Sequence, residues 1–153
     1  AFFGTSYGVL AQDVLVRQDA WTGSISITTQ EREIFRDSDG IVVVRPIIIQ
    51  SQSGRAFGVF TNVRRRDANG PVVNRITSGV QTLQYARHDR LNSHCIDGCQ
   101  RAEVGVIYLS EDSFRIAART GLPLRIWGWR GRYDGTVPAD AFALVLARLG
   151  QDS

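Results

Sequence analysis

Hydrophobic and polar residues alternate along much of the chain, which is the pattern expected of β-strands with one buried face. The alternation is clearest in residues 24–28 and 55–63. In the second segment, Phe57, Val59 and Val63 fall on one face of the predicted strand. Turn-forming sequences rich in Asp, Asn, Ser and Gly separate such segments, so hairpins and an antiparallel sheet are expected. Further strands are predicted at residues 72–76, 80–85, 103–109 and 122–130.

The segment of residues 41–49 is apolar on both faces and is interrupted only by Arg45 and Pro46. A strand of this kind needs cover on both sides. Because proline donates no ladder hydrogen bond, Pro46 is expected at a sheet edge or at a bulge. The helix predicted for residues 138–150 is apolar nearly all round, so it is the candidate cover for the second face. An apolar face left over by this packing would form a homodimer contact.

Two helices are predicted in the C-terminal part of the chain. The first follows Leu109, where Ser110 is a good N-cap residue and Gly121 is a helix stop. The second is the apolar helix, which begins with Pro138 at a position where proline is favoured. Both helices therefore have recognisable starts in the sequence.

The chain of 153 residues is predicted to form a single domain, residues 1–153. Its fold class is α+β, mainly antiparallel β, with the strands arranged as a sandwich and with the two helices described above. Residues 1–21 are expected to form a loose N-terminal segment. The spacing of four apolar residues predicts a short helix there, with one apolar face made of Val9, Leu10, Val14 and Leu15.

Composition narrows the functional classes. Hydrophobic residues make up 43% of the chain and charged residues 22%, which excludes collagen-like, coiled-coil and wholly disordered proteins. All 18 basic residues are Arg, and Lys is absent. Schiff-base and pyridoxal-phosphate chemistry and the lysine-dependent P-loop are therefore excluded, and no cofactor is predicted. No apolar run approaches the roughly 18 residues that a transmembrane segment needs.

The net charge of +3 is a mild excess, and the basic residues are spread along the chain apart from the run Arg64-Arg65-Arg66. Nucleic-acid-binding proteins usually gather their basic residues on one face, so nucleic acid is not the expected partner. Three charges at the end of a hairpin are usually a solvated tip. An Arg-mediated binder of nucleic acid or anionic lipid is the alternative, and it requires these three arginines to share a face with others.

The two cysteines, Cys95 and Cys99, are separated by three residues that include a glycine, so a small turn could bring them to disulfide distance. A disulfide needs an oxidising compartment, which favours the periplasm or the cell envelope. The alternatives are free thiols and a metal site completed by His88 and His94, although this spacing is not a usual zinc pattern. The chain starts at Ala1, as it would after cleavage of an export signal, removal of an initiator methionine or trimming.

The stretch of residues 124–133 carries the strongest indication of binding. It combines Trp, Tyr and Arg, and Trp and Arg are enriched at binding hot spots. On one continuous strand, Arg125, Trp127 and Trp129 would share a face. Such a face suits a sugar ring, a base or a partner loop, and the alternative is that the indoles fill the core beneath a helix. The predicted binding residues are Arg125, Trp127, Trp129, Arg130, Arg132 and Tyr133.

Two motifs raise the alternatives of catalysis and calcium binding. Residues 4–8 match the G-x-S-x-G nucleophile elbow, but only three residues precede them where the elbow needs a strand. A small secreted hydrolase using His88 or His94 with a nearby carboxylate is the resulting alternative. Asp37-x-Asp39-Gly40 and Asp67-x-Asn69-Gly70 resemble parts of a calcium loop without its final Glu. Hairpin turns explain both equally well, and no metal site is predicted.

Several short motifs in the C-terminal half occur together in a fixed order. They are Cys95-x3-Cys99, Glu103-Val104-Gly105-Val106, Leu109-Ser110, Phe114-x2-Ala117-Ala118-x2-Gly121-Leu122, Gly128-x2-Gly131 and Pro138-Ala139-x2-Phe142. In this order the segment resembles uncharacterised exported, lipoprotein-like envelope proteins of Gram-negative bacteria. The resemblance implies that the two cysteines pair and that the protein lies in the periplasm or cell envelope, but it implies no activity. The sequence thus predicts a non-enzymatic protein that binds another protein or a cell-wall component.

Overall fold

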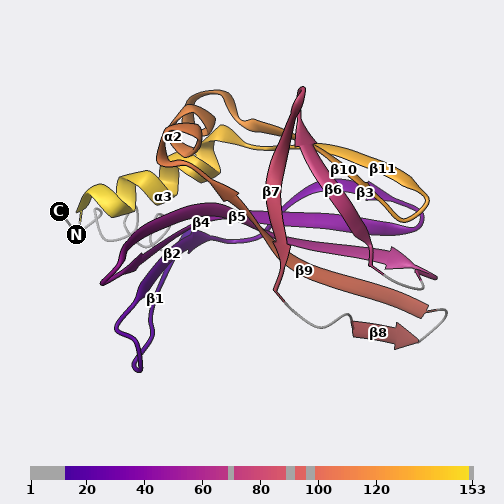
Figure 1. Cartoon of the computed structure of the whole chain (residues 1–153), viewed down its shortest axis with the longest axis horizontal. Helices are drawn as coiled ribbons and strands as arrows, with labels where there is room; N and C mark the ends of the chain where they lie inside the picture. Colours follow the sequence, from indigo (N-terminus) through magenta and orange to yellow (C-terminus); the bar gives the residue numbers. More distant parts are fainter. Residues whose placement is uncertain (1–12, 69–70, 89–91, 96–98, 152–153) are drawn as a thin grey trace, which may run out of the picture.

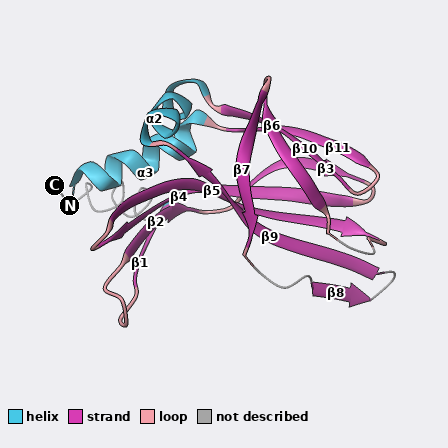
Figure 2. Ribbon diagram, in the orientation of Figure 1, coloured by secondary structure: helices cyan, strands magenta, loops and turns pink. Residues whose placement is uncertain are grey.

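The computed structural model describes residues 13–68, 71–88, 92–95 and 99–151, with only the backbone described for residues 92–95 and Cys99. Most of these residues form strands of one sheet, and two helices follow late in the chain (Figures 1 and 2). The strands are β1 (Val14–Gln18), β2 (Ile25–Thr29), β3 (Arg32–Asp37), β4 (Gly40–Ser51), β5 (Gly54–Arg66), β6 (Val73–Ser78), β7 (Gln81–Arg87), β8 (Asn92–Cys95), β9 (Cys99–Leu109), β10 (Leu122–Gly128) and β11 (Gly131–Val137). The helices are α2 (Glu111–Thr120) and α3 (Ala139–Gln151).

The strands follow the order β1-β2-β4-β5-β9-β7-β6-β10-β11, with β3 beside β4 and β8 beside β9. Every one of these pairings is antiparallel. The sheet curls into a half-barrel (Figure 1). The α+β, mainly antiparallel class predicted from the sequence is therefore confirmed. The expected sandwich is not, because the described strands join into one curled sheet and not into two packed sheets.

The central strand β4 explains the position of its proline. Its first half pairs with β3 as far as Val44, and its second half pairs with β2 from Ile47 onward. Pro46 lies in the gap between these two partners, so its missing N–H costs no ladder hydrogen bond there. The Pro46 carbonyl oxygen accepts a hydrogen bond from the buried Thr28 hydroxyl at 2.6 Å. The expectation of an edge position for Pro46 is confirmed for this side of β4.

The concave face of the sheet holds the core. Cross-strand register places Ile48 opposite Phe57, Val42 opposite Val63 and Val59 opposite Ile107, and all six side chains are buried on this face. Helices α2 and α3 cover one end of the same face (Figure 1). The second face of β4, which α3 was expected to cover, is the convex face.

The convex face of β4 remains partly exposed. Ile49 on β4 is 40% exposed, whereas its neighbour Ile48 on the concave face is fully buried. The prediction that something covers both faces is therefore wrong for the described part of the chain, because both helices lie on the same side.

Within the part of the chain that the structure describes, no helix is long and apolar enough to cross a bilayer.

The two ends of the curl meet where β11 approaches β3. The Phe35 and Tyr133 rings stack with centroids 5.7 Å apart. Gly135 lies so close to the Ile34 carbonyl oxygen that a Cβ would overlap it. A side chain at position 135 would therefore push these two strands apart. Strands β11 and β3 are therefore joined here by side-chain packing, and no ladder of backbone hydrogen bonds between them is described.

The structure corrects the expectation of an N-terminal helix. Val14 and Leu15 begin β1 and do not form a helix, because they pair with Thr29 and Thr28 of β2. The other two residues of the predicted apolar face, at positions 9 and 10, lie outside the described residues.

Two strand predictions are also corrected. Strand β3 occupies a segment for which the sequence predicted only a turn at its end. The strand predicted at residues 122–130 ends at Gly128, and a second strand, β11, follows it. The predicted caps of α2, Ser110 and Gly121, are both confirmed.

Candidate functional site

The predicted binding stretch forms a hairpin, which divides its residues between two faces. Gly128 of β10 pairs with Gly131 of β11 across the loop residues Trp129 and Arg130. Because side chains alternate along each strand, Arg125, Trp127 and Arg132 lie on the convex face while Tyr133 lies on the concave face. Of the six predicted binding residues, the structure brings together only Arg125, Trp127 and Arg132 on one face.

Trp127 is the centre of a cluster of arginines on the convex face. The neighbouring strands place Arg75 of β6 and Arg132 of β11 directly opposite it, and Arg125 precedes it on β10. The guanidinium carbons lie 4.7 Å from the ring centroid for Arg75 and 5.9 Å for both Arg125 and Arg132. We call these four residues the Arg–Trp cluster. Cation–π attraction of this kind holds a guanidinium against an indole while its N–H edge stays available to a ligand.

The charge of the Arg–Trp cluster is only partly balanced. Asp134 accepts two hydrogen bonds from Arg125, at 3.0 and 3.2 Å, and lies 3.9 Å from the Nε of Arg132. Three arginines against one carboxylate leave a local charge of +2. Among the described residues, no carboxylate forms an ion pair with Arg75. The cluster therefore presents an excess of donors that suits an anionic group.

A hollow of about 450 Å³ adjoins the Arg–Trp cluster. Its volume lies within the range of about 300–1,000 Å³ found for small-molecule sites. The Trp127 indole donates to the Thr77 hydroxyl at 3.2 Å, which fixes the ring beside the hollow. The hollow is lined by Thr77, Gly79, Pro123, Leu124, Arg125, Asp134, Gly135 and Thr136. The lining combines hydroxyl groups and an Arg–carboxylate pair with small apolar side chains.

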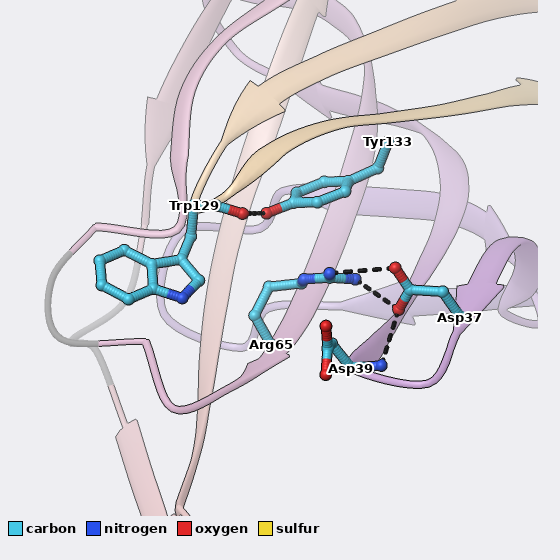
Figure 3. A network of polar contacts seen from close by, with 5 residues as sticks. All are labelled: Asp37, Asp39, Arg65, Trp129 and Tyr133. Atoms are coloured by element: carbon cyan, nitrogen blue, oxygen red, sulfur yellow. Dashed lines mark hydrogen bonds and ion pairs between the residues drawn. The ribbon is translucent and has the colours of Figure 1, made fainter.

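Tyr133 belongs instead to a buried network on the concave face, which Figure 3 shows. The Arg65 guanidinium lies 4.2 Å from the centre of the Tyr133 ring. The same guanidinium donates to both carboxylate oxygens of Asp37, at 2.8 and 3.1 Å. The Tyr133 hydroxyl donates to the backbone carbonyl of Trp129. This network therefore ties the β3–β4 turn, β5 and the β10–β11 loop together where the curl closes.

The hydrogen bonds from Arg65 lower the pKa of the Asp37 carboxyl, with a further contribution from the backbone N–H of Asp39. A lowered folded-state pKa means that the ionised Asp37 stabilises the fold above its unfolded pKa of about 3.9, and that this contribution disappears as the pH falls through the folded pKa. We expect Asp37→Asn to lower the free energy of unfolding at pH 7, and we expect the difference from the wild type to shrink progressively as the pH falls below about 4. Urea unfolding at several pH values measures the difference. A constant difference down to the lowest pH would contradict it, and the exposed Glu31→Gln change is the control.

Trp129 and Arg130 form the loop of the hairpin. Arg130 has a φ of +61°, a left-handed conformation that is uncommon for a side-chain-bearing residue. Its guanidinium lies 5.6 Å from the Trp129 ring. The Trp129 backbone N–H donates to the Val72 carbonyl at 3.0 Å, and its ring is half-buried. Trp129 therefore holds the hairpin against the segment before β6.

A buried carboxylate that the sequence did not single out lies deeper in the curl. Glu103 of β9 is 1% exposed and accepts hydrogen bonds from the backbone N–H groups of Val72 and Val73, at 2.8 and 3.3 Å. It also accepts one from the Tyr85 hydroxyl at 2.7 Å. Burial and this hydrogen bond raise the pKa of Tyr85. The signal in the sequence was a charged residue in phase with Ile107 and Leu109 on the buried face of a strand.

No protein-family model, no curated protein and no solved structure matches this chain. The geometry of the described residues is therefore what distinguishes the candidate sites. It favours the Arg–Trp cluster, because that cluster is exposed, carries excess charge and adjoins a hollow.

The run Arg64-Arg65-Arg66 is divided between the two faces of the sheet. Arg65 is 4% exposed and faces the core, whereas Arg64 and Arg66 are exposed. The condition that all three share a face is therefore not met. The reason is that neighbouring residues of β5 point to opposite sides of the sheet.

The alternative of a hydrolase that uses His88 or His94 has little support among the described residues. His88 is exposed, and its Nε2 lies 2.7 Å from the hydroxyl of Tyr108 and so is paired with a tyrosine. The side chain of His94 and the whole of residues 4–8 lie outside what the structure describes. Among the described residues, no group of three or more His, Cys, Asp or Glu side chains could hold a metal ion.

The remaining motifs lie in turns. Asp37-x-Asp39-Gly40 forms the β3–β4 turn, in which the Asp37 side chain accepts from the Asp39 N–H at 2.9 Å. The second calcium-like motif extends into residues 69–70, which are not described. The backbone places Cys95 opposite Cys99 in the β8–β9 pair. Their side chains are not described, so the disulfide stays a prediction that a free-thiol assay can test.

Proposed function

We propose that this is a non-enzymatic binding protein of the periplasm or cell envelope, and that it holds an anionic group of its ligand on the Arg–Trp cluster. The observation that supports this proposal is the gathering of Arg75, Arg125 and Arg132 around Trp127 with one carboxylate to balance them. A guanidinium supplies paired N–H donors in a fixed plane, which match the two oxygens of a carboxylate or phosphate.

The location is proposed on two grounds. One is the resemblance of the C-terminal half to exported envelope proteins. The other is the pair of closely spaced cysteines, which an oxidising compartment would allow to bond. The ligand proposed for this setting is a component of the cell wall or an envelope protein that carries acidic groups. A homodimer through α3 has less support, because its residues Ala141, Phe142, Val145 and Leu149 are buried against the sheet and α2.

Calorimetric titration with polygalacturonate, a carboxylated polysaccharide, at low salt tests the proposal. We expect the double variant Arg75→Gln/Arg132→Gln to bind about 100-fold more weakly than the wild type, because each charge-assisted hydrogen bond to the ligand strengthens binding by at least about tenfold. The exposed pair Arg115→Gln/Arg119→Gln on α2 makes the same change in net charge away from the site and should bind within about threefold of the wild type. Equal reductions in affinity for the two double variants, or no binding by the wild type, would contradict the proposal.

A further inference from the structure

A second basic hollow lies on the convex face, at the same end of the half-barrel as the Arg–Trp cluster. It has a volume of about 320 Å³ and includes Arg36, Arg64 and Arg66 in its lining. The cross-strand register places Arg36 beside Ile41, and Ile41 beside Arg64, so these side chains share the convex face. We call the three arginines the rim arginines.

The rim arginines are only partly neutralised. Arg36 is bound by Glu33 at 2.6 Å. Asp37, which also borders the hollow, is bound by the buried Arg65 on the opposite face. Among the described residues, neither Arg64 nor Arg66 forms an ion pair. Asp39 also borders the hollow, so the two exposed guanidiniums of Arg64 and Arg66 against this one carboxylate leave a local charge of +1 for a ligand.

The closing contact of the half-barrel joins this hollow to the Arg–Trp cluster. Phe35 of β3 stacks on Tyr133 of β11 on the concave face. The next residue of β3, Arg36, and the preceding residue of β11, Arg132, therefore both turn to the convex face at the same level. Figure 1 shows the β3–β4 and β10–β11 turns side by side at the end of the molecule away from the helices. The arginines thus form a band that runs from β6 across β10, β11 and β3 to β5.

We propose that the ligand of this protein is a linear acidic polysaccharide, and that it lies along the band so that separate acidic groups bind the Arg–Trp cluster and the rim arginines. This inference rests on the proposed function and adds the ligand class and a second site. A chain with acidic groups at intervals gains affinity because the second contact is made within the same complex, at a high effective concentration.

The aromatic residues of the band argue against single-stranded nucleic acid as its ligand. Nucleic acid of that kind binds by stacking its bases on open aromatic rings. Here the Trp127 ring has guanidiniums over it, and the Trp129 ring is half-buried beside Arg130. Trp21 is 96% exposed but lies in the loop between β1 and β2, at the other side of the molecule in Figure 1. The band therefore offers charge and hydrogen-bond donors, and it offers no stacking platform among its described residues.

Galacturonate oligomers of two lengths test the inference by calorimetry at low salt. The wild type should bind an oligomer of twelve residues at least about tenfold more tightly than a dimer. The double variant Arg64→Gln/Arg66→Gln should lose most of this gain with length and bind the dimer as the wild type does. Both side chains are exposed, and an unchanged circular dichroism spectrum and melting temperature would show that the variant is folded.

The failures of the two proposals are distinguishable. Equal affinity for the two lengths, or a twelve-residue affinity unchanged by Arg64→Gln/Arg66→Gln, would overturn the extended ligand while leaving the proposed function intact. Tighter binding of single-stranded DNA or polyglutamate of equal length than of the galacturonate oligomer would overturn the ligand class. If Arg75→Gln/Arg132→Gln abolished anion binding while the wild-type affinity did not depend on oligomer length, the Arg–Trp cluster would be the single binding site. That result would also overturn the extended ligand. Equal behaviour of Arg75→Gln/Arg132→Gln and Arg115→Gln/Arg119→Gln would overturn the proposed function itself.

Discussion

Replacing Glu103 by alanine is expected to lower the free energy of unfolding by about 3–5 kcal/mol, because it leaves three buried donors without an acceptor. The donors are the backbone N–H groups of Val72 and Val73 and the hydroxyl of Tyr85. Val72 is fully buried and Val73 is 6% exposed, so water cannot readily replace the carboxylate there. Urea unfolding at pH 7 measures the loss.

Two milder variants separate the loss of hydrogen bonds from the loss of side-chain volume. Glu103→Gln keeps an oxygen that can accept from the backbone N–H groups, so its cost should be smaller, about 1–2 kcal/mol. Tyr85→Phe removes one donor to the carboxylate and should cost a similar amount. A loss below about 1 kcal/mol for Glu103→Ala would show that this carboxylate does not hold the segment before β6 in place.

Replacing Phe142 by alanine is expected to cost about 3–5 kcal/mol, since it opens a cavity between α3 and the sheet. Phe142 is fully buried and meets the Phe114 ring edge-on, with centroids 4.9 Å apart. Phe114 in turn packs against Phe57 of β5 at 5.4 Å. These three rings join both helices to the concave face, so one substitution should weaken the packing of both.

Thermal and urea unfolding at two protein concentrations measure the effect of Phe142→Ala. The control is Ile116→Ala on α2, a side chain that is 49% exposed, which should cost less than about 1 kcal/mol. A small loss for Phe142→Ala that grows on dilution would contradict the packing described here. It would indicate instead that α3 is stabilised by contact with a second copy of the chain.

The strands of the half-barrel could largely be predicted because alternation is a local property. Residues 55–63 and 103–109 are recognisable as strands, and their inward residues are those expected from the period of two. The helix α2 begins after Ser110 and ends before Gly121, as its capping residues require. Each of these features depends on side chains close together in the sequence.

The hairpin between β10 and β11 was missed because its loop carries no conventional turn sequence. Trp129 and Arg130 are not typical turn residues, although Arg130 adopts a positive φ, which glycine or asparagine usually provides in such loops. The spacing Gly128-x2-Gly131 was the available signal, since these glycines form the pair that closes the loop. On one continuous strand without the hairpin, Tyr133 would lie on the same face as Trp127.

The sequence by itself determined the class of the fold, the caps of α2 and the presence of aromatic and arginine side chains in one short stretch. Only the tertiary structure decided which arginines gather around Trp127. Arg75 comes from β6, and β7, β8, β9 and α2 separate that strand from β10 along the chain. It also decided that Arg65 turns inward to Asp37 while Arg64 and Arg66 face solvent. Alternation fixes each side chain relative to its neighbours, but the curl and register of the sheet decide which face is buried and which strands meet.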